Sequence, residues 1–211
     1  MPRIEPFEKN SEKYEDWFEK NKFVYESEIQ AIKELFPKVE KSIEIGVGSG
    51  KFAVPLGIKI GIDPSPRMRK IAQQRGIEVI DAIAEELPFK DSQFELALMV
   101  TSICFVDNLN LAFREVYRIL KPGGYLIIGF VDKDSSLGKL YQQHKEKSLF
   151  YKIATFYSTK EVVNNLSKVG FKEFYFRQTI FHSINEIKNV EPVKENYGEG
   201  SFVVIRARKL K

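Results

Sequence analysis

The fold of this chain can be read first from residues 42–53, SIEIGVGSGKFA. The apolar start is typical of a buried parallel strand, and glycines then follow at every second position, Gly46, Gly48 and Gly50. Glycine has no side chain and adopts backbone angles that other residues avoid, so a ligand can approach the backbone closely. Glu44, near the carboxyl end of the strand, can accept hydrogen bonds from an ammonium or hydroxyl group. A strand, a glycine loop and a helix-like pattern in this order indicate a nucleotide-binding α/β domain.

A second acidic residue stands where the next strand ends. Residues 58–63, IKIGID, read as an apolar strand that closes with Asp63. A carboxylate at that place can accept from the two neighbouring hydroxyls of a ribose, because it has two oxygens. Asp63 is also an ordinary cap for the helix that residues 64–68, PSPRM, begin, and both roles stay open. Together with the glycine loop, Asp63 favours nucleoside binding.

Two further stretches complete a set of four motifs. Residues 84–95 read AEELPFKDSQFE, and residues 118–124 read RILKPGG, in which proline ends a helix and glycines reverse the chain. The glycine loop reads Glu-x-Gly-x-Gly-x-Gly rather than the Gly-x-Gly-x-x-Gly of dinucleotide sites. In this order the four motifs resemble those of the class I S-adenosylmethionine-dependent methyltransferases, in their type 11 or UbiE-like subgroup.

The resemblance implies a fold and a division of the chain. The fold class is α/β: a Rossmann-like, doubly wound, seven-stranded, mostly parallel sheet with an antiparallel last strand and helices on both faces. We expect a single methyltransferase domain over residues 1–211. Residues 1–40 would form a helical N-terminal cap, residues 41–131 the cofactor-binding half, and residues 132–211 the acceptor-side half with a closing hairpin.

The resemblance also implies S-adenosylmethionine as cofactor and S-adenosylhomocysteine as product. In the family the glycine loop packs against the methionine part, and backbone beside the alanine of the third motif holds the adenine edge. Tyr14 lies in a segment, YEDWF, that is similar to the family's N-terminal stretch, where a tyrosine can face the methionine end. A simple core contact is the alternative for this residue. The expected cofactor-binding residues are Tyr14, Glu44, Gly46, Gly48, Gly50, Asp63, Pro64, Met68, Ala84, Glu85, Leu87 and Thr101.

The chain departs from the family pattern at two places. Many members carry an aspartate where this chain has Ile83, so a polar contact to the adenine amino group is missing or comes from backbone, Asp81 or Glu85. The segment between Gly50 and Asp63 is short for the family, and Pro55 interrupts it. We expect a first crossover helix of about two turns, which covers one face of the sheet poorly.

Residues 101–104, TSIC, follow the central strand and should border the acceptor cleft. They lack the Asn/Asp-Pro-Pro-Tyr/Phe pattern of enzymes that methylate exocyclic amines of DNA bases. Cys104 lacks the neighbouring proline of cytosine C5 methyltransferases, and we interpret it as a small buried side chain. RNA or protein stays open as acceptor, but a small molecule is preferred because no aromatic-basic platform for RNA is present.

No side chain stands out as a general base, and we expect no metal. The two histidines, His144 and His182, are weak catalytic candidates. Residues 132–156 are irregular and rich in lysine, and the family's equivalent segment carries or closes over the acceptor. A solvent-exposed helix over residues 139–147 is the alternative reading there. The candidate lid residues are Tyr141, His144, Phe150, Tyr151 and Phe156.

Composition limits the remaining classes of function. The net charge of +4 is spread along the 211 residues, so nucleic acid is an unlikely partner. The single cysteine excludes an intrachain disulfide, and no run is long enough to span a bilayer, so we expect a cytoplasmic protein with no membrane contact, as a monomer or homodimer. A nucleotide-cofactor oxidoreductase on the same fold, or a non-catalytic S-adenosylmethionine-binding protein, is the alternative to a methyltransferase.

Overall fold

A mixed sheet of eight strands runs through the computed structural model, which describes residues 4–210. The strands are β1 (Ser42–Ile45), β2 (Ile60–Ile62), β3 (Glu78–Ile80), β4 (Phe94–Val100), β5 (Leu120–Val131), β6 (Phe171–Thr179), β7 (Lys194–Glu195) and β8 (Phe202–Lys209). Their order across the sheet is β3-β2-β1-β4-β5-β8-β6-β7, so the chain winds outward from β1 in both directions. This reversal at β1 and β4 is where ligands bind in doubly wound sheets.

The strand directions confirm the expected Rossmann-like class. Strands β1 to β5 pair in parallel, whereas the last strand, β8, pairs antiparallel with both β5 and β6. The strand number differs from the expected seven, because the two-residue strand β7 adds to the edge at β6. The polar connection before β8 gave no apolar alternation from which this short strand could be predicted.

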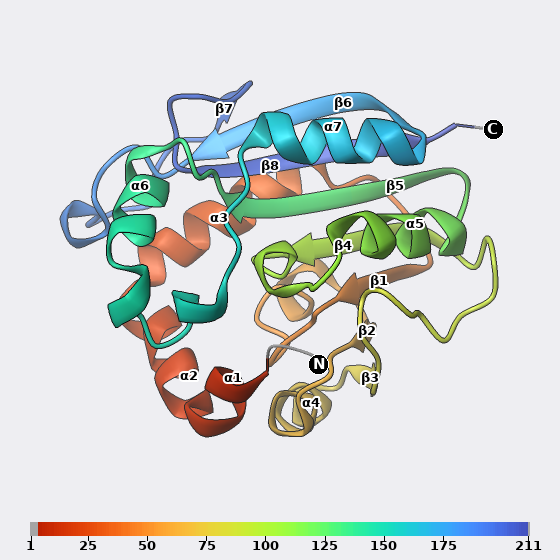
Figure 1. Cartoon of the computed structure of the whole chain (residues 1–211), viewed down its shortest axis with the longest axis horizontal. Coiled ribbons are helices and arrows are strands. Elements are labelled where there is room, and N and C mark those ends of the chain that lie inside the picture. The colour runs from red at the N-terminus through yellow and green to blue at the C-terminus, as the bar shows by residue number, and fades with distance from the viewer. Residues whose placement is uncertain (1–3, 211) are drawn as a thin grey trace.

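Helices cover both faces of the sheet, as expected (Figure 1). The α-helices are α1 (Glu5–Lys9), α2 (Ser11–Lys20), α3 (Lys22–Leu35), α4 (Pro66–Gln74), α5 (Leu109–Ile119), α6 (Ser136–Gln143) and α7 (Thr159–Val169). Short 3-10 turns are η1 (Val54–Leu56), η2 (Ile103–Phe105), η3 (Lys145–Lys147), η4 (Tyr151–Ile153) and η5 (Ile184–Glu186). Helices α5 and α7 pack on one face and α3 on the other.

Local sequence explains where several helices begin and end. The Ser65 hydroxyl accepts the Met68 N–H at the start of α4, and Ser158 forms a capping box with Glu161 at the start of α7. Helix α5 ends immediately before β5, whose first residues include Pro122 and Gly123, the latter with φ of 83°. These residues therefore fix where α4 and α7 begin and where α5 ends.

The first crossover contains no α-helix, which corrects the expected two turns. Between β1 and β2 there is only η1, because Pro55 stands at its start and Gly57 ends it in the left-handed region, with φ of 73°. The expected poor coverage is also wrong. Phe52 fills the space, with its ring 6.1 Å from that of Phe18 on α2 and 5.5 Å from that of Tyr25 on α3. The N-terminal helices therefore replace the missing crossover helix.

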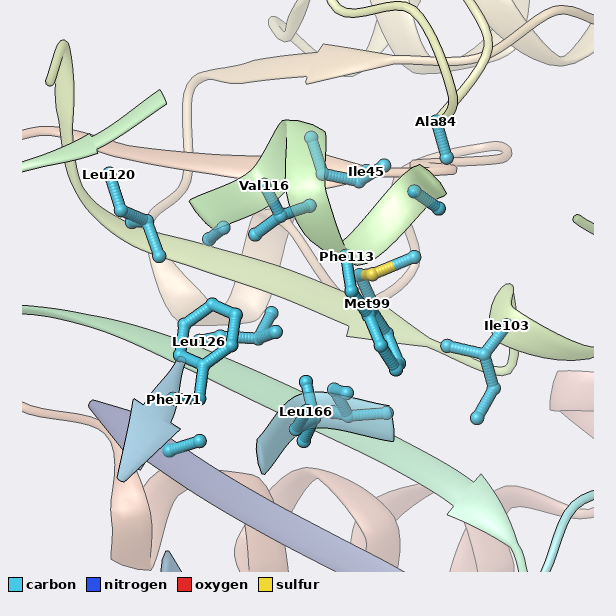
Figure 2. Close-up of a cluster of buried hydrophobic side chains, with 14 of the residues drawn as sticks. Ile45, Ala84, Met99, Ile103, Phe113, Val116, Leu120, Leu126, Leu166 and Phe171 are labelled. Carbon is cyan, nitrogen blue, oxygen red and sulfur yellow. The ribbon is translucent and has the colours of Figure 1, made fainter. Parts of the chain in front are cut away.

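The larger core cluster lies between the sheet and helices α5 and α7 (Figure 2). Phe113 and Val116 of α5 meet Met99 of the central strand there, and Leu166 of α7 packs beside them. All four side chains are fully buried. Burial of this apolar area stabilises the central strands, and it holds their carboxyl ends in place on the opposite edge from the α5–β5 turn.

Candidate active site

One cavity of about 260 Å³ opens at the carboxyl ends of β1, β2 and β4. Nine of the twelve expected cofactor-binding residues line it: Tyr14, Gly46, Gly48, Asp63, Pro64, Met68, Ala84, Glu85 and Thr101. They come from α2, the glycine loop, the start of α4 and the segments after β3 and β4. Residues far apart in the sequence thus meet at the edge where a doubly wound sheet binds its ligand.

The glycine loop forms one wall of the cavity. Gly46 has φ of 74°, and a Cβ built on it would lie 2.7 Å from the Cβ of Ser102. Gly48 has φ of 53°, and a Cβ there would point to the Tyr14 hydroxyl oxygen at 3.3 Å. A side chain at Gly46 would collide with the segment after β4, and one at Gly48 would fill the space between the loop and α2. The loop is therefore shaped for a group that lies against its backbone.

Gly50 has a different role from the other two glycines. Its φ is 85°, and a Cβ there would lie 2.5 Å from Cδ1 of Ile77, which belongs to the core. Gly50 does not line the cavity, so its structural contribution is to let the loop pack onto the segment before β3.

Asp63 projects from the end of β2 with both carboxylate oxygens already bonded to backbone. Oδ2 accepts the Gly48 N–H and Oδ1 accepts the Ser65 N–H, both at 2.8 Å. Burial raises the pKa of Asp63 to about 6, although these two hydrogen bonds and Arg69 oppose the rise. Since each carboxylate oxygen has two lone pairs, one on each oxygen remains for the two hydroxyls of a ribose. Ser65, rather than Asp63, caps α4.

Glu44 lies beneath the loop and does not line the cavity. Its side chain is buried, and Oε2 has no hydrogen-bond partner within residues 4–210. Burial raises the pKa of Glu44 well above its usual range, and the neighbouring charge of Asp63 raises it further. An orphaned carboxylate oxygen, a loop that excludes side chains and a carboxylate with free lone pairs fit a cofactor that carries a ribose and an ammonium group, such as S-adenosylmethionine.

The third motif lies at the other end of this wall. Ile83, Ala84 and Glu85 line the cavity, whereas Leu87 is buried in the core cluster of α5 and α7. Glu85 accepts the N–H groups of Asp107 at 2.7 Å and Asn108 at 3.0 Å. Its carboxylate thus holds the start of α5 beside the cavity.

A connection between the third and fourth motifs was not expected from the sequence. Arg118 of RILKPGG donates to the carbonyl oxygens of Leu87 at 2.9 Å and Phe89 at 2.7 Å. Glu115 accepts the Leu87 N–H at 2.9 Å and pairs with Arg118. The Leu-Pro-Phe loop is therefore held by α5, and this explains how Leu87 supports the site without lining the cavity.

The opposite side of the cavity is aromatic. We call it the aromatic chamber, and its rings are Phe7, Trp17, Phe18, Phe105, Tyr141, Phe150 and Tyr151. Phe7 stands between Phe105 and Phe150, with ring centroids at 5.0 and 5.4 Å, and Tyr141 stacks on Tyr151 at 4.7 Å. Three of the expected lid residues, Tyr141, Phe150 and Tyr151, thus line the cavity.

Tyr14 stands where the aromatic chamber meets the glycine loop. Its ring lies 5.8 Å from that of Phe7 and 6.0 Å from that of Phe150, while its hydroxyl approaches Gly48. Burial and the charges of nearby carboxylates raise the pKa of Tyr14, so it stays a neutral hydrogen-bond donor. The structure therefore gives Tyr14 both a packing contact and a place beside the loop.

Helix α1 is fastened next to the cofactor loop. Glu8 accepts the Arg67 N–H at 3.0 Å and the hydroxyl of Ser65, while the Arg67 guanidinium donates to the Ser11 hydroxyl. These contacts join the N-terminal helices to the start of α4. They hold Phe7 over the cavity.

Glu28 is a cavity residue that the sequence analysis missed. It lies on α3, is only 5% exposed and lines the cavity. A signal was available, because Val24, Glu28 and Ile32 lie four residues apart on the apolar stripe of one helix. A charged residue on such a stripe is unusual and should have been noted.

The remaining sequence candidates lie outside the cavity. His144 is exposed, and its Nδ1 lies 3.1 Å from the Leu140 carbonyl oxygen. His182 is also outside, with Nδ1 2.5 Å from Glu191 Oε1, and its hydrogen bond with Glu191 raises the pKa of His182. Phe156 packs behind Tyr151, with ring centroids at 5.7 Å. The structure therefore brings neither histidine to the place where an acceptor would react.

The segment after β4 closes the floor of the cavity. Thr101 has φ of 48°, a strained value for a β-branched residue, and its N–H donates to the Gly129 carbonyl at 2.8 Å. Ser102 also lines the cavity, and its hydroxyl oxygen has no hydrogen-bond partner within residues 4–210. Cys104 is half-buried rather than fully buried, and its thiol donates to the Thr101 carbonyl at 3.3 Å. Backbone strain of this kind is concentrated at functional sites.

Residues 4–210 contain no helix with both the length and the apolar character needed to cross a membrane. Within the same residues, no group of three His, Cys, Asp or Glu side chains is arranged to hold a metal ion.

Comparison with known proteins gives a consistent result. Residues 43–128 match a family model described as a methyltransferase domain. A crystal structure from Thermotoga maritima, described as an S-adenosylmethionine-dependent methyltransferase and possible histamine N-methyltransferase, is 54% identical with a TM-score of 0.96. The alignment covers 98% of this chain and 99% of that one.

Two curated relatives extend the comparison. An uncharacterised protein of Methanocaldococcus jannaschii is 50% identical over 204 residues, which cover 97% of this chain and 98% of the relative. The demethylmenaquinone methyltransferase of Chlorobaculum tepidum is 31% identical over 127 residues, which cover 56% of this chain and 52% of that protein. The long matches extend through the N-terminal helices and the acceptor side, beyond the part that the family model covers.

Proposed function

Since this chain belongs to the S-adenosylmethionine-dependent methyltransferases, we propose that it transfers the methyl group to a small-molecule acceptor held in the aromatic chamber. One observation carries this proposal. The same cavity is lined by the glycine loop and Asp63 on one side and by the aromatic chamber on the other. A cofactor on the first side and an acceptor on the second would therefore share one space, as direct transfer between them requires.

Some residues of the cavity would bind the cofactor, and others would exclude water. Asp63 would accept the ribose hydroxyls, Gly46 and Gly48 would pack against the methionine part, and Glu44 would accept from its ammonium group. Ala84 and Glu85 would border the adenine. When bound, S-adenosylmethionine supplies an already activated methyl group for in-line displacement, so the protein mainly provides alignment and a dry cavity. The rings of Phe7, Phe105 and Phe150 support the exclusion of water.

The nature of the cavity supports a small acceptor. Its chamber side is built from rings on separate elements rather than from an open basic surface. Histamine is the first acceptor to test, because the Thermotoga maritima relative is described as a possible histamine N-methyltransferase. A nitrogen, oxygen or carbon atom can receive the methyl group in such a site, and the family alone does not select among them.

Three broader points belong to the same proposal. Residues 1–40, 41–131 and 132–211 would act as cap, cofactor-binding half and acceptor-side half of one domain. The protein would work in the cytoplasm, since its single cysteine suits a reducing compartment. It would act as a monomer or homodimer, because the cavity is formed within one chain. Nucleic acid would not be a partner, because the net charge of +4 is spread along the chain.

The test is a calorimetric titration of the protein with S-adenosylmethionine, S-adenosylhomocysteine and NADH in parallel. We expect affinity of about micromolar strength for the first two and no heat from NADH. Incubation with S-adenosylmethionine and a panel of small amines, phenols and acids should then release S-adenosylhomocysteine with at least one acceptor. Binding of NADH alone, or cofactor binding without turnover on any acceptor of the panel, would contradict the proposal.

A further inference from the structure

A second buried carboxyl faces the cavity without a partner. Glu28 on α3 is 5% exposed, and its carboxyl makes no hydrogen bond or ion pair within residues 4–210. Buried carboxyls normally have such partners, because an unpaired one loses its hydration without compensation. An unpaired carboxyl in a ligand cavity therefore points to a group that the ligand supplies.

The charge of the cavity indicates the sign of that group. Its lining contains four carboxyl side chains, those of Glu28, Asp63, Glu85 and Asp107. No lysine, arginine or histidine within residues 4–210 lines the cavity. Asp63 and Glu85 already accept backbone N–H groups. A cation is the complement of this lining, whereas an anionic acceptor would find no basic side chain there to pair with.

Glu28 shares the cavity with two rings of the aromatic chamber, Tyr141 on α6 and Tyr151 on η4. Burial dominates the raised pKa values of both tyrosines and of Tyr14 beside the glycine loop, and the negative charge of Glu28 raises all three further. The Glu28 carboxyl therefore lies within electrostatic reach of these two rings of the aromatic chamber. Aromatic faces attract cations, so rings and a carboxyl together form a site suited to an organic ammonium group.

We propose that Glu28 binds the amino group of the acceptor, and that the acceptor is a small basic amine with an apolar body. This inference rests on the proposed function, because it assumes that the aromatic chamber holds the acceptor. The carboxyl would accept the amine N–H, and the rings would enclose the apolar body. Burial also raises the pKa of Glu28 to about 8, and pairing with an ammonium group would favour its charged form.

The cofactor's own ammonium group is the competing partner. Glu44 and the glycine loop lie at the end of β1, next to the expected cofactor, whereas Glu28 lines the cavity from helix α3. The two roles make different predictions. An acceptor-binding Glu28 leaves the affinity for S-adenosylhomocysteine intact when it is changed, and a cofactor-binding Glu28 does not.

The experiment compares amines with alcohols of the same size. Calorimetry would titrate the wild-type protein, saturated with S-adenosylhomocysteine, with phenethylamine against 2-phenylethanol and with histamine against the alcohol that replaces its amino group. The same titrations would use Glu28→Gln, which keeps the size of the side chain but cannot carry charge. Glu26→Gln is the matched control, since Glu26 is on the same helix, pairs with Lys22 at 3.7 Å and does not line the cavity.

We expect the wild-type protein to prefer at least one amine over its alcohol by about tenfold or more, the range of a charge-assisted hydrogen bond. Glu28→Gln should lose this preference and keep its affinity for S-adenosylhomocysteine, while Glu26→Gln keeps both. Equal binding of amine and alcohol by the wild-type protein, a preserved preference in Glu28→Gln, or loss of S-adenosylhomocysteine binding in that variant would each overturn the inference. Failure of the wild-type protein to bind S-adenosylhomocysteine would instead remove the proposed function, and titrations without it would still decide the role of Glu28.

Discussion

The two sides of the cavity are built in different ways. The cofactor side consists of backbone and short polar side chains at strand ends, as with Gly46 and Asp63, whose carboxylate accepts backbone N–H groups of Gly48 and Ser65. The acceptor side consists of rings from α1, α2, α6, η2 and η4, together with the lone carboxyl of Glu28. A cofactor common to a whole family needs fixed backbone geometry, whereas an acceptor is selected by side chains on variable helices and turns.

This difference predicts that glycine substitutions damage the cofactor side most. Gly46 and Gly57 have nearly equal φ, 74° and 73°, but only a Cβ on Gly46 meets a neighbour, Ser102, at 2.7 Å. We expect Gly46→Ala to lower the affinity for S-adenosylhomocysteine by about 100-fold or more, since backbone must move to relieve the contact. Gly57→Ala carries the same backbone strain and should leave this affinity within about twofold. Equal losses of this affinity in the two variants, measured by calorimetry, would contradict the role of Gly46 in cofactor binding.

The next largest effect concerns Asp63. Its loss should cost on the order of 2–3 kcal/mol of cofactor binding, the range for charge-assisted hydrogen bonds to two hydroxyls. Since the pKa of Asp63 is raised to about 6, protonation should weaken the wild-type affinity for S-adenosylhomocysteine as pH falls through about 6. Calorimetry between pH 5 and 8 checks both points, in the wild type and in Asp63→Ala. A variant with wild-type affinity, or one with the same pH dependence as the wild type, would contradict the assignment.

On the acceptor side we expect a substitution to increase the stability of the fold rather than to weaken binding. Removal of the charge of Glu28 should stabilise the folded protein. Burial raises the pKa of Glu28 to about 8, so the folded protein holds its proton more tightly than the unfolded chain does. Stability is therefore lost as pH rises from about 4.5 to about 8. Among residues 4–210, the ionised carboxyl acts on four tyrosines, Tyr14, Tyr25, Tyr141 and Tyr151, which are neutral in this range. Denaturant unfolding should find Glu28→Gln more stable than the wild type by roughly 4–5 kcal/mol at pH 9, with little difference at pH 4. A difference that does not vary with pH would mean that Glu28 is paired.

The smallest effect on methyl transfer is expected at His182, which lies away from both sides of the cavity. Its hydrogen bond with Glu191 raises the pKa of His182, so the stability that this pair contributes is present below the unfolded pKa and is lost as pH rises through the folded value. Since His182 does not line the cavity, His182→Gln should change the rate of methyl transfer by less than about twofold. A large fall in rate with unchanged stability would return this histidine to the list of catalytic candidates.

The cofactor side was open to prediction from sequence because each of its motifs is a short contiguous stretch. The spacing of Gly46, Gly48 and Gly50 and the position of Asp63 after an apolar strand specify a loop and a strand end by local chemistry. The acceptor side was not, because contacts such as Phe7 with Phe105 join residues that are far apart in sequence and leave no periodic signal. Pro55 did indicate a short crossover. The contact of Phe18 with Phe52, which fills the place of the missing crossover helix, is tertiary and could not be predicted from local sequence.

The most direct test of the difference between the two sides is a crystal structure of the protein with S-adenosylhomocysteine bound. We expect the ribose hydroxyls to donate to Asp63 and the homocysteine part to lie along Gly46 and Gly48. We expect no cofactor atom within hydrogen-bond distance of Glu28. A homocysteine amino group bonded to Glu28, or a ribose away from Asp63, would contradict it. In that case the cofactor would extend into the aromatic chamber, and the acceptor would have to bind elsewhere.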